Sequence, residues 1–417
     1  MKIVALTKEE FDNFAYHHKY STYYQTSAYA ETSRYEGLNT FYIGFVQDNE
    51  LVGVTLFLHK TIYLYYKYAY APRGFLIDYT DSKLVKNVTM GLINLLKKQH
   101  YAFIKIDPPI ICSERDNKGN IIYFSNTINQ ILDTLKSNSY IHMGFNKYFE
   151  NYKPRLNAFV NLTYDLEKIY SNITNEVKEK IENSIKSGLE ISLDTTGNVD
   201  ELYKFIGTKN KKRRKRYYQG MYNNFSRNNA IDIFFVNINT DKYLSNMKTN
   251  YDLEAIKNDE LASMVQDMSI ASSQKQLILN DKMKSDERLN FYKNELIYAT
   301  NLSRNHPDYF TIGAGFTIKH NNGVELIIDS YLDEYLKFNP RYVFIWELIK
   351  KYKNEGFMYI NLNGVVGNFS KDKLGKYKNL NDPKLSFNST IIEYIGEFDL
   401  VINDRIYKKY KEEIEKK

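Results

Sequence analysis

Hydrophobic and polar positions near the start of the chain predict a hairpin, a third strand, a helix and a buried strand, in that order. Residues 41–60 hold two runs of β-branched and aromatic residues around a polar turn, which is typical of a hairpin. A third such run covers 61–71. Apolar residues recur at helical spacing over 81–100, and 103–107 is a short apolar run that stops before two prolines.

The same order returns late in the chain. Residues 310–331 contain two apolar runs around an Asn-Asn-Gly turn, which predicts a second hairpin. Residues 340–356 begin with proline and end with glycine, as helices prefer, and 357–362 predict a strand. Hairpin, helix and strand therefore occur twice. The pattern predicts an α/β (α+β) fold of two related halves, each with a mixed sheet.

A polar segment, 241–306, lies between these halves and contains neither glycine nor proline. Two groups of apolar residues in it have the spacing of a helical seam: Leu261, Met264 and Met268, then Leu289, Tyr292 and Leu296. We expect an antiparallel two-helix arm with its turn near 272–275, although an ordinary pair of surface helices would give the same pattern. The expected divisions are 1–152 for the first half, 153–240 and 307–417 for the second half, and 241–306 for the arm.

Composition narrows the classes of protein that fit. The chain has 57 Lys and Arg against 50 Asp and Glu, a formal net charge of +7, which suits a polyanionic partner without requiring one. Its one cysteine, Cys112, excludes a disulfide framework, a Cys-based zinc site and an iron–sulfur cluster. Zincin, Walker, nucleophile-elbow and dinucleotide-binding motifs are absent from the sequence, so we expect no metal and no cofactor.

Targeting signals are also missing from the sequence. No run of about 18 apolar residues occurs. The first residues turn acidic at once and lack the long apolar core of a signal peptide. We therefore expect a cytoplasmic protein.

Two local features are candidates for chemistry. Residues 211–216 are six consecutive basic residues, followed by Tyr217 and Tyr218. Phosphates would neutralise their mutual repulsion and the tyrosines would stack on bases, but a solvated charge run is the competing interpretation. The second feature is Asp107, at the end of a predicted buried strand, where either a functional carboxylate or an ion-paired one is common.

Six short segments follow one another along nearly the whole chain: YQTS at 24–27, YAPRGFLIDY at 70–79, KIDP at 105–108, WELI at 346–349, YINLNGVVG at 359–367 and EYIGEFD at 393–399. Together they resemble motifs of the Fem family of peptidoglycan-bridge aminoacyltransferases. The second resembles that family's Arg-Gly-Pro motif, which is followed by two hydrophobic residues and an aspartate, and the third matches its [KR]-x-D-P strand end.

This resemblance implies two GNAT-like acyltransferase halves with an inserted coiled-coil arm. It implies transfer of an amino acid (Gly, Ser or Ala) from aminoacyl-tRNA to the stem-peptide amine of lipid II or of its UDP-linked muramyl pentapeptide. It implies no metal and no covalent enzyme intermediate. Peripheral contact with the cytoplasmic membrane face follows from a lipid-linked acceptor, and association with a second copy or a related transferase is left open.

The resemblance also implies roles for particular residues. Lys384 aligns with a lysine that stabilises the oxyanion, and Asp107 with an aspartate beside the acceptor amine. Pro383 and Ser386 depart from the family pattern around that lysine. Arg73 lies in the Arg-Gly-Pro-like motif, and Arg34 stands beside the position where the family has a lysine. Two alternative Arg/Tyr pairs are Arg214 with Tyr218 and Arg216 with Tyr222. These six residues, together with Phe387, are expected to bind substrate.

Two other functions fit the same sequence. A specialised homologue would insert serine in place of glycine and confer immunity to a bridge-cleaving enzyme. A non-catalytic RNA-binding or scaffold protein would use the basic run and the arm alone, and would need neither Lys384 nor Asp107.

Overall fold

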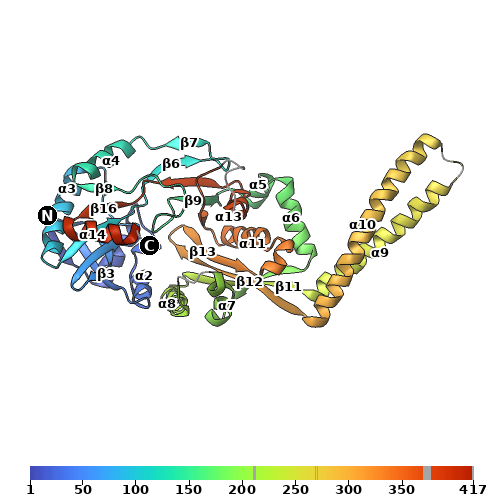
Figure 1. Ribbon diagram of the computed structural model, residues 1–417, viewed down its shortest axis with the longest axis horizontal. Helices are drawn as coiled ribbons and strands as arrows, with labels where there is room; N and C mark the ends of the chain where they lie inside the picture. The colour runs from blue at the N-terminus through green and yellow to red at the C-terminus, as the bar shows by residue number, and fades with distance from the viewer. Residues whose placement is uncertain (210–212, 268, 270, 370–376, 416–417) are drawn as a thin grey trace.

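The computed structural model has a body with two sheets, from which a pair of long helices projects (Figure 1). It describes the chain except for residues 210–212, 268, 270, 370–376 and 416–417. The predicted mixed α/β architecture is confirmed. Both predicted repeats of hairpin, helix and strand are present, as β2–β3 with α3 and β5, and as β12–β13 with α11 and β14.

The first sheet has seven strands in the order β1-β2-β3-β4-β5-β16-β8. All neighbours are antiparallel except β4 and β5, which are parallel and are joined through α3. The strands are β1 (Lys2–Ala5), β2 (Asn39–Gln47), β3 (Glu50–Tyr63), β4 (Tyr66–Ala71), β5 (Tyr101–Ile106), β16 (Phe398–Val401) and β8 (Tyr140–His142).

The second sheet has nine strands in the order β10-β11-β12-β13-β14-β9-β15-β6-β7. Its one parallel pair in the described chain is β13 with β14, joined through α11, which repeats the arrangement of β4, α3 and β5. The strands are β10 (Leu189–Asp194), β11 (Ile231–Asn239), β12 (Tyr309–His320), β13 (Gly323–Tyr331), β14 (Tyr359–Gly364), β9 (Leu156–Asn161), β15 (Thr390–Tyr394), β6 (Ile111–Arg115) and β7 (Ile121–Phe124).

The two sheets exchange strands. β6 and β7 follow β5 in the chain but belong to the second sheet, whereas β16 follows β15 but belongs to the first. Each sheet therefore contains strands from both sides of residue 152. The divisions at 152, 240 and 306 remain predictions.

Apolar cores fix the helices on the sheets. α3 (Ser82–Lys97) and α4 pack on the first sheet, and α5, α6 and α11 (Pro340–Asn354) pack on the second. A third core lies between the halves and takes residues from α1, α2, α7, α8 and both sheets. The remaining bounds are α1 (Lys8–His17), α2 (Ser27–Arg34), α4 (Ile128–Ser137), α5 (Leu166–Ser171), α6 (Asn175–Lys186), α7 (Val199–Lys209), α8 (Lys215–Phe225), α13 (Lys378–Leu385) and α14 (Asp404–Glu415).

Local sequence signals set several helix ends. Thr7 and Glu10 form a reciprocal capping box at the start of α1. The Asp81 carboxylate accepts the Leu84 N–H at 2.9 Å and so begins α3. Pro340 occupies the first turn of α11, where its missing N–H costs nothing.

The arm consists of α9 (Thr240–Gln266) and α10 (Ser272–Asn305), which lie side by side (Figure 1). The predicted turn at 272–275 is wrong, because those residues already form the first turn of α10. The chain turns earlier, where Asp267 caps the end of α9 and its carboxylate accepts the Ser269 N–H at 2.8 Å. Met264, predicted in the seam, is 48% exposed. No helix in the part of the chain that the structure describes is long and apolar enough to cross a bilayer.

Candidate active site between the two sheets

The parallel pair β4 and β5 brings Arg73 and Asp107 together. Ala71 lies opposite Ile106 in the register, so the residues that follow both strands meet at one edge of the sheet. The Arg73 backbone N–H donates to Asp107 Oδ1 at 2.7 Å, and the Tyr70 hydroxyl donates to Oδ2 at 3.1 Å. Arg73 Nη1 lies 3.7 Å from the same Oδ2. Asp107 is 1% exposed, so all of its described partners are protein groups.

A buried glutamine holds the turn that carries Arg73. Gln25 Nε2 donates to the Pro72 carbonyl at 2.7 Å, and Gln25 Oε1 accepts the Leu56 N–H at 2.7 Å. Arg73 itself has a left-handed φ of 52°. The first and second resembling segments are therefore parts of one structure, in which Gln25 fixes the Arg73 backbone against Asp107.

Burial dominates the electrostatics of Asp107. Loss of solvent raises the pKa of Asp107 above its ordinary value, although the Arg73 guanidinium and the hydrogen bond from the Arg73 N–H oppose this. Both carboxylate oxygens already have donors. The arrangement suits Asp107 to orienting Arg73 and the turn around it.

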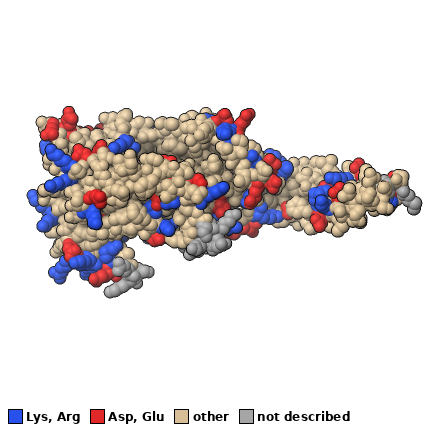
Figure 2. Space-filling model, turned by 90° about the horizontal axis from the view of Figure 1, so that it is seen from above, with Lys and Arg blue, Asp and Glu red and all other residues tan. Residues whose placement is uncertain are grey.

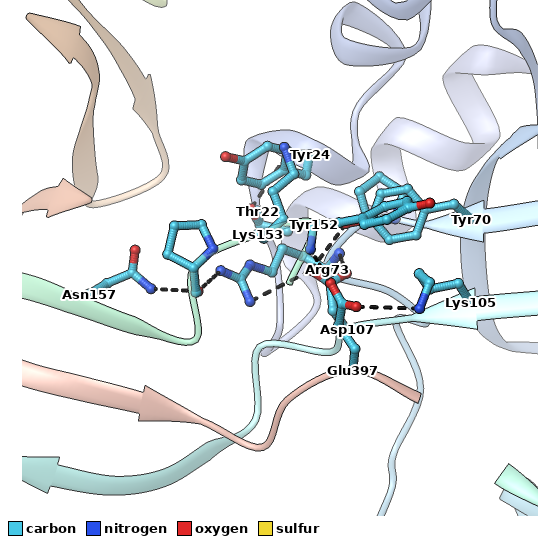
Figure 3. A network of polar contacts seen from close by, with 12 residues as sticks. Thr22, Tyr24, Tyr70, Arg73, Lys105, Asp107, Tyr152, Lys153, Asn157 and Glu397 are labelled. Carbon is cyan, nitrogen blue, oxygen red and sulfur yellow. Dashed lines mark hydrogen bonds and ion pairs between the residues drawn. The ribbon is translucent and has the colours of Figure 1, made fainter. Parts of the chain in front are cut away.

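Arg73 and a second cation, Lys153, each lie over a tyrosine ring, and Figure 3 shows Lys153 beside Tyr24. The Arg73 guanidinium carbon is 4.5 Å from the centre of the Tyr394 ring, and Nη2 donates to the Pro154 carbonyl at 2.8 Å. Lys153 Nζ is 3.9 Å from the centre of the Tyr24 ring. Burial lowers the pKa of Lys153. Sequence reasoning missed Lys153, because its position depends on how the loop before β9 packs against the first half.

An ion cluster stabilises the strands behind Asp107. Lys105 Nζ lies 2.7 Å from Asp399 Oδ1 and 3.3 Å from Glu397 Oε2, which joins β5 to β16 (Figure 3). Glu397 also accepts the backbone N–H of Tyr152. The third and sixth resembling segments therefore meet in this cluster.

The second parallel pair contributes Glu325 and Asn361. These residues are opposite each other in the register of β13 and β14. The Tyr24 hydroxyl donates to Glu325 Oε1 at 3.3 Å, and the Asn361 side chain donates to the same carboxylate. Both residues line a cavity of about 110 Å³ that also reaches Arg73. Glu325 was not among the residues predicted from sequence, because nothing within its own strand marks it.

Lys384 is a buried amine in the last turn of α13. Its side chain is 7% exposed, and Nζ donates to the Gly364 carbonyl at 2.8 Å. Burial lowers the pKa of Lys384 to about 8, a shift that the nearby Asp329 partly opposes. Pro383 lies in the same turn, and Ser386 is the C-cap residue.

A short series of contacts joins Lys384 to Arg73. Gly364 lies opposite Asn157 in the ladder of β14 and β9. Asn157 Nδ2 donates to the Pro154 carbonyl at 3.0 Å, and Arg73 donates to that same carbonyl. Lys384 and Asp107 do not touch, but one continuous network connects their surroundings.

The other residues expected to bind substrate lie in several places. Arg34 is exposed and pairs with Glu31 at 3.1 Å. Arg214 and Arg216 are exposed at the start of α8. Tyr218 is buried against the rings of Tyr203 and Phe316, Tyr222 packs against Gly197, and Phe387 is buried in the core of the second half. Their roles in binding stay predictions.

A different Arg/Tyr pair with the same spacing faces the site. Arg213 pairs with Glu36, and its guanidinium carbon lies 4.4 Å from the centre of the Tyr217 ring. Tyr217 lies in the same buried core as Tyr24 and Tyr29, the two rings over which Lys153 lies, so it is beside the site. The sequence has the same Arg/Tyr spacing one position before Arg214 and Tyr218. Only the orientation of α8 in the structure shows which pair faces the site. Residues 211 and 212 of the basic run lie outside the described residues.

A larger cavity, of about 810 Å³, lies between α1, α2 and the turn that joins β12 to β13. His320 lines this cavity and the smaller one at Glu325. The His320 ring nitrogen is 2.8 Å from the Ser21 hydroxyl, and burial lowers the pKa of His320 to about 4. His320 is therefore a neutral side chain shared by both cavities at neutral pH.

Comparison with known proteins places this site in a family. The model of the FemAB family matches residues 6–414. Aminoacyltransferase FemA of Staphylococcus epidermidis is 24% identical over 422 residues, covering 99% of this chain and 98% of that protein. Aminoacyltransferase FemA of Staphylococcus aureus is 24% identical over 422 residues, covering 98% of this chain and 97% of that protein.

A solved structure supports the same assignment at the level of the fold. The crystal structure of FemX superimposes with a TM-score of 0.72 at 18% sequence identity, covering 98% of this chain and 99% of that one. The family match spans nearly all of the chain, including every element that builds the site. This chain belongs to the FemAB family and is an aminoacyltransferase.

Proposed function

We propose that the protein transfers one glycine, serine or alanine from aminoacyl-tRNA to the stem-peptide amine of a peptidoglycan precursor, either lipid II or the UDP-linked muramyl pentapeptide. The observation that carries this proposal is Lys384, a buried lysine with a pKa of about 8 that is joined by contacts to Arg73 and Asp107. Such an amine supplies a positive charge in a site that water does not screen.

The reaction needs no energy source beyond the donor, because an aminoacyl ester is already activated. The unprotonated acceptor amine attacks the ester carbonyl and forms a tetrahedral intermediate with a negative oxygen. The Lys384 ammonium would stabilise that oxygen, an effect typically worth about 10²–10³ in rate. Collapse of the intermediate breaks the ester C–O bond. The amine gives up its proton, and the ribose oxygen of the tRNA leaves as a hydroxyl.

Asp107 and Arg73 would act as positioning residues in this scheme. Asp107 fixes the Arg73 backbone and guanidinium through contacts of 2.7 and 3.7 Å. Arg73 in turn holds the Pro154 carbonyl and covers the Tyr394 ring. Loss of Asp107 would therefore disturb substrate placement through Arg73.

We also propose that the protein works in the cytoplasm and contacts the inner membrane face peripherally, since a lipid-linked acceptor is held there. Association with a second copy or a related transferase belongs to the same proposal.

A transfer assay read by mass spectrometry tests the proposal. Purified protein is incubated separately with glycyl-, seryl- and alanyl-tRNA. The acceptor is lipid II or the UDP-linked pentapeptide, and each acceptor is tested both without bridge residues and with one or more already attached. We expect a mass gain of one residue with a single donor. Folded protein that gives no gain with any pair of donor and acceptor would contradict the proposal and favour a non-catalytic function.

A further inference from the structure

Glu325 differs from the other carboxylates inside the body. The five carboxylates buried in the described part of the chain, Asp107, Asp232, Glu393, Glu397 and Asp399, each lie within 4.0 Å of a Lys or Arg nitrogen. None of the ion pairs formed among the described residues includes Glu325, whose partners are the neutral side chains of Tyr24 and Asn361. Glu325 is half-buried, and a carboxylate that has lost part of its water without gaining a direct cation is destabilised unless a ligand supplies one.

The cavity beside Glu325 has the walls of an ammonium-binding site. Tyr24, Tyr359, Tyr394 and Phe159 line it together with Glu325. Aromatic rings attract cations through their faces, and this attraction is strongest where water is excluded. Arg73 and Lys153 already lie over two of these rings, so the site uses this interaction for its own cations.

The size of the cavity beside Glu325 limits the groups that it can hold. A volume of about 110 Å³ accommodates a few water molecules or one small organic group, such as a small amino acid or the end of an amine side chain, and excludes a sugar. Burial raises the pKa of Glu325, while Arg73 and Lys153 oppose this from beyond contact distance. A cation that enters the cavity would favour the charged carboxylate.

We propose that Glu325 binds the primary ammonium group of a substrate inside this aromatic cavity, which has room for only one small organic group. The inference rests on the proposed function and deepens it. Asp107, the carboxylate chosen from sequence, has both oxygens occupied by protein donors, whereas Glu325 lines the cavity and its partners, Tyr24 and Asn361, are neutral. The ammonium belongs either to the α-amino group of the donor ester or to the acceptor amine.

A binding experiment tests the ammonium site without turnover. Glycine methyl ester and methyl glycolate have the same shape, but the second carries a hydroxyl in place of the ammonium. We expect the wild-type protein to bind the ammonium ester about tenfold or more tightly in an NMR titration, and Glu325→Gln to remove this preference. Glu334→Gln, at an exposed carboxylate of the same half, removes the same charge and should keep the preference. Equal binding of both esters by wild type, or a preference that survives in Glu325→Gln, would overturn the proposal.

Transfer kinetics identify which substrate supplies the ammonium. If it is the donor, Glu325→Gln lowers kcat/KM with an aminoacyl-tRNA but not with the matching hydroxyacyl-tRNA. If it is the acceptor, the acceptor KM rises equally with both donors. Unchanged kinetics with both substrates would refute the site. Wild-type protein that prefers the ammonium ester but transfers no residue would refute the proposed function alone and leave the site standing.

Discussion

Lys384 combines burial with a bond to a backbone carbonyl instead of a carboxylate, and two opposing effects decide what its replacement does to stability. Lys384→Met removes a charge that burial disfavours, but it leaves the Gly364 carbonyl without its donor, at a cost of about 1–3 kcal/mol. We expect these effects to offset, with little change in Tm by calorimetry. Turnover should fall about 10²–10³-fold in the transfer assay.

Lys378→Met is the matched control, because Lys378 is exposed on the same helix. It should leave turnover and Tm unchanged. Wild-type turnover in Lys384→Met would remove Lys384 from the mechanism.

The pKa of Lys384 also predicts a pH dependence. Lys384 is cationic below pH about 8 and loses its charge above it. The acceptor amine must be unprotonated to attack, and its ordinary pKa is about 10.4, so the rate should rise with pH below 8 and level off above it. Lys384→Arg keeps its charge at every pH used, and its rate should go on rising above pH 8. A pH profile of kcat compares the two. Levelling near pH 8 that persists in Lys384→Arg would assign it to another group.

Stability gives a second measure of the same group. The folded pKa lies below the ordinary value of 10.5, so the unfolded chain binds more protons between pH 8 and 10.5. The free energy of unfolding should therefore gain a contribution from Lys384 as pH rises through this window. Urea titrations at several pH values should show that contribution in wild type and not in Lys384→Met.

The sequence predicted the site residues whose position follows from the order of neighbouring elements. It missed the residues whose position depends on how the two halves pack together. Asp107 and Arg73 follow neighbouring parallel strands, so the prediction of two strand ends nearly suffices to bring them together. Lys153, Tyr217 and Glu325 come from a loop, a helix and a strand that meet only when both halves are folded.

At the scale of elements, the arm has a polar centre where an apolar seam was expected. Ser285 is fully buried, accepts a hydrogen bond from Asn258 at 3.1 Å and donates to Glu254 at 2.7 Å. Arg288 donates to the same Glu254 oxygen at 2.8 Å. Buried polar contacts of this kind fix the register of paired helices at some cost in stability.

Ser285→Ala should therefore loosen the middle of the arm. It removes the donor to Glu254 and an acceptor for Asn258, which should cost about 1–2 kcal/mol of local stability. Hydrogen exchange of α9 and α10 amides measures this. Met283→Ala, at a position that is 58% exposed on the same helix, should leave exchange unchanged. Equal exchange in both variants would show that the polar centre contributes nothing to pairing.

The repeated hairpin, helix and strand could be predicted because each is encoded by a local pattern. The exchange of β6, β7 and β16 between sheets could not, because periodicity identifies a strand without identifying its partner. The misplaced turn of the arm has a related cause. A polar helix pair without glycine or proline gives no local signal for where the chain reverses.

At the scale of the whole molecule, ion pairs neutralise part of the basic run. Figure 2 shows acidic and basic side chains interspersed on the face of the arm seen from above. Within the basic run, Arg213 pairs with Glu36 and Lys215 with Asp200 at 2.5 Å. Arg214 and Arg216 are exposed, and no ion pair among the described residues includes them, so they are available to phosphates.

The double variant Arg214→Ala with Arg216→Ala should bind tRNA or the precursor more weakly than the wild-type protein. The slope of log affinity against log salt should become shallower by about 1–2. Lys83→Ala with Lys86→Ala removes two exposed charges from α3, far from the run in the sequence, and serves as the control. Unchanged affinity and slope in the arginine variant would make the run a solvated surface.

The exchange of strands has a consequence for how the protein is made. β8 is joined to its sheet only through β16, and β16 also covers one edge of β5. A ribosome releases β5 and β8 long before it synthesises residues 398–401, so one edge of β5 stays unpaired, and β8 has no strand to pair with, until almost the whole chain has emerged. Open edges invite pairing with other chains. No single cut can therefore divide this enzyme into two halves that each fold alone, and the nascent chain must be protected while it waits for its last strand.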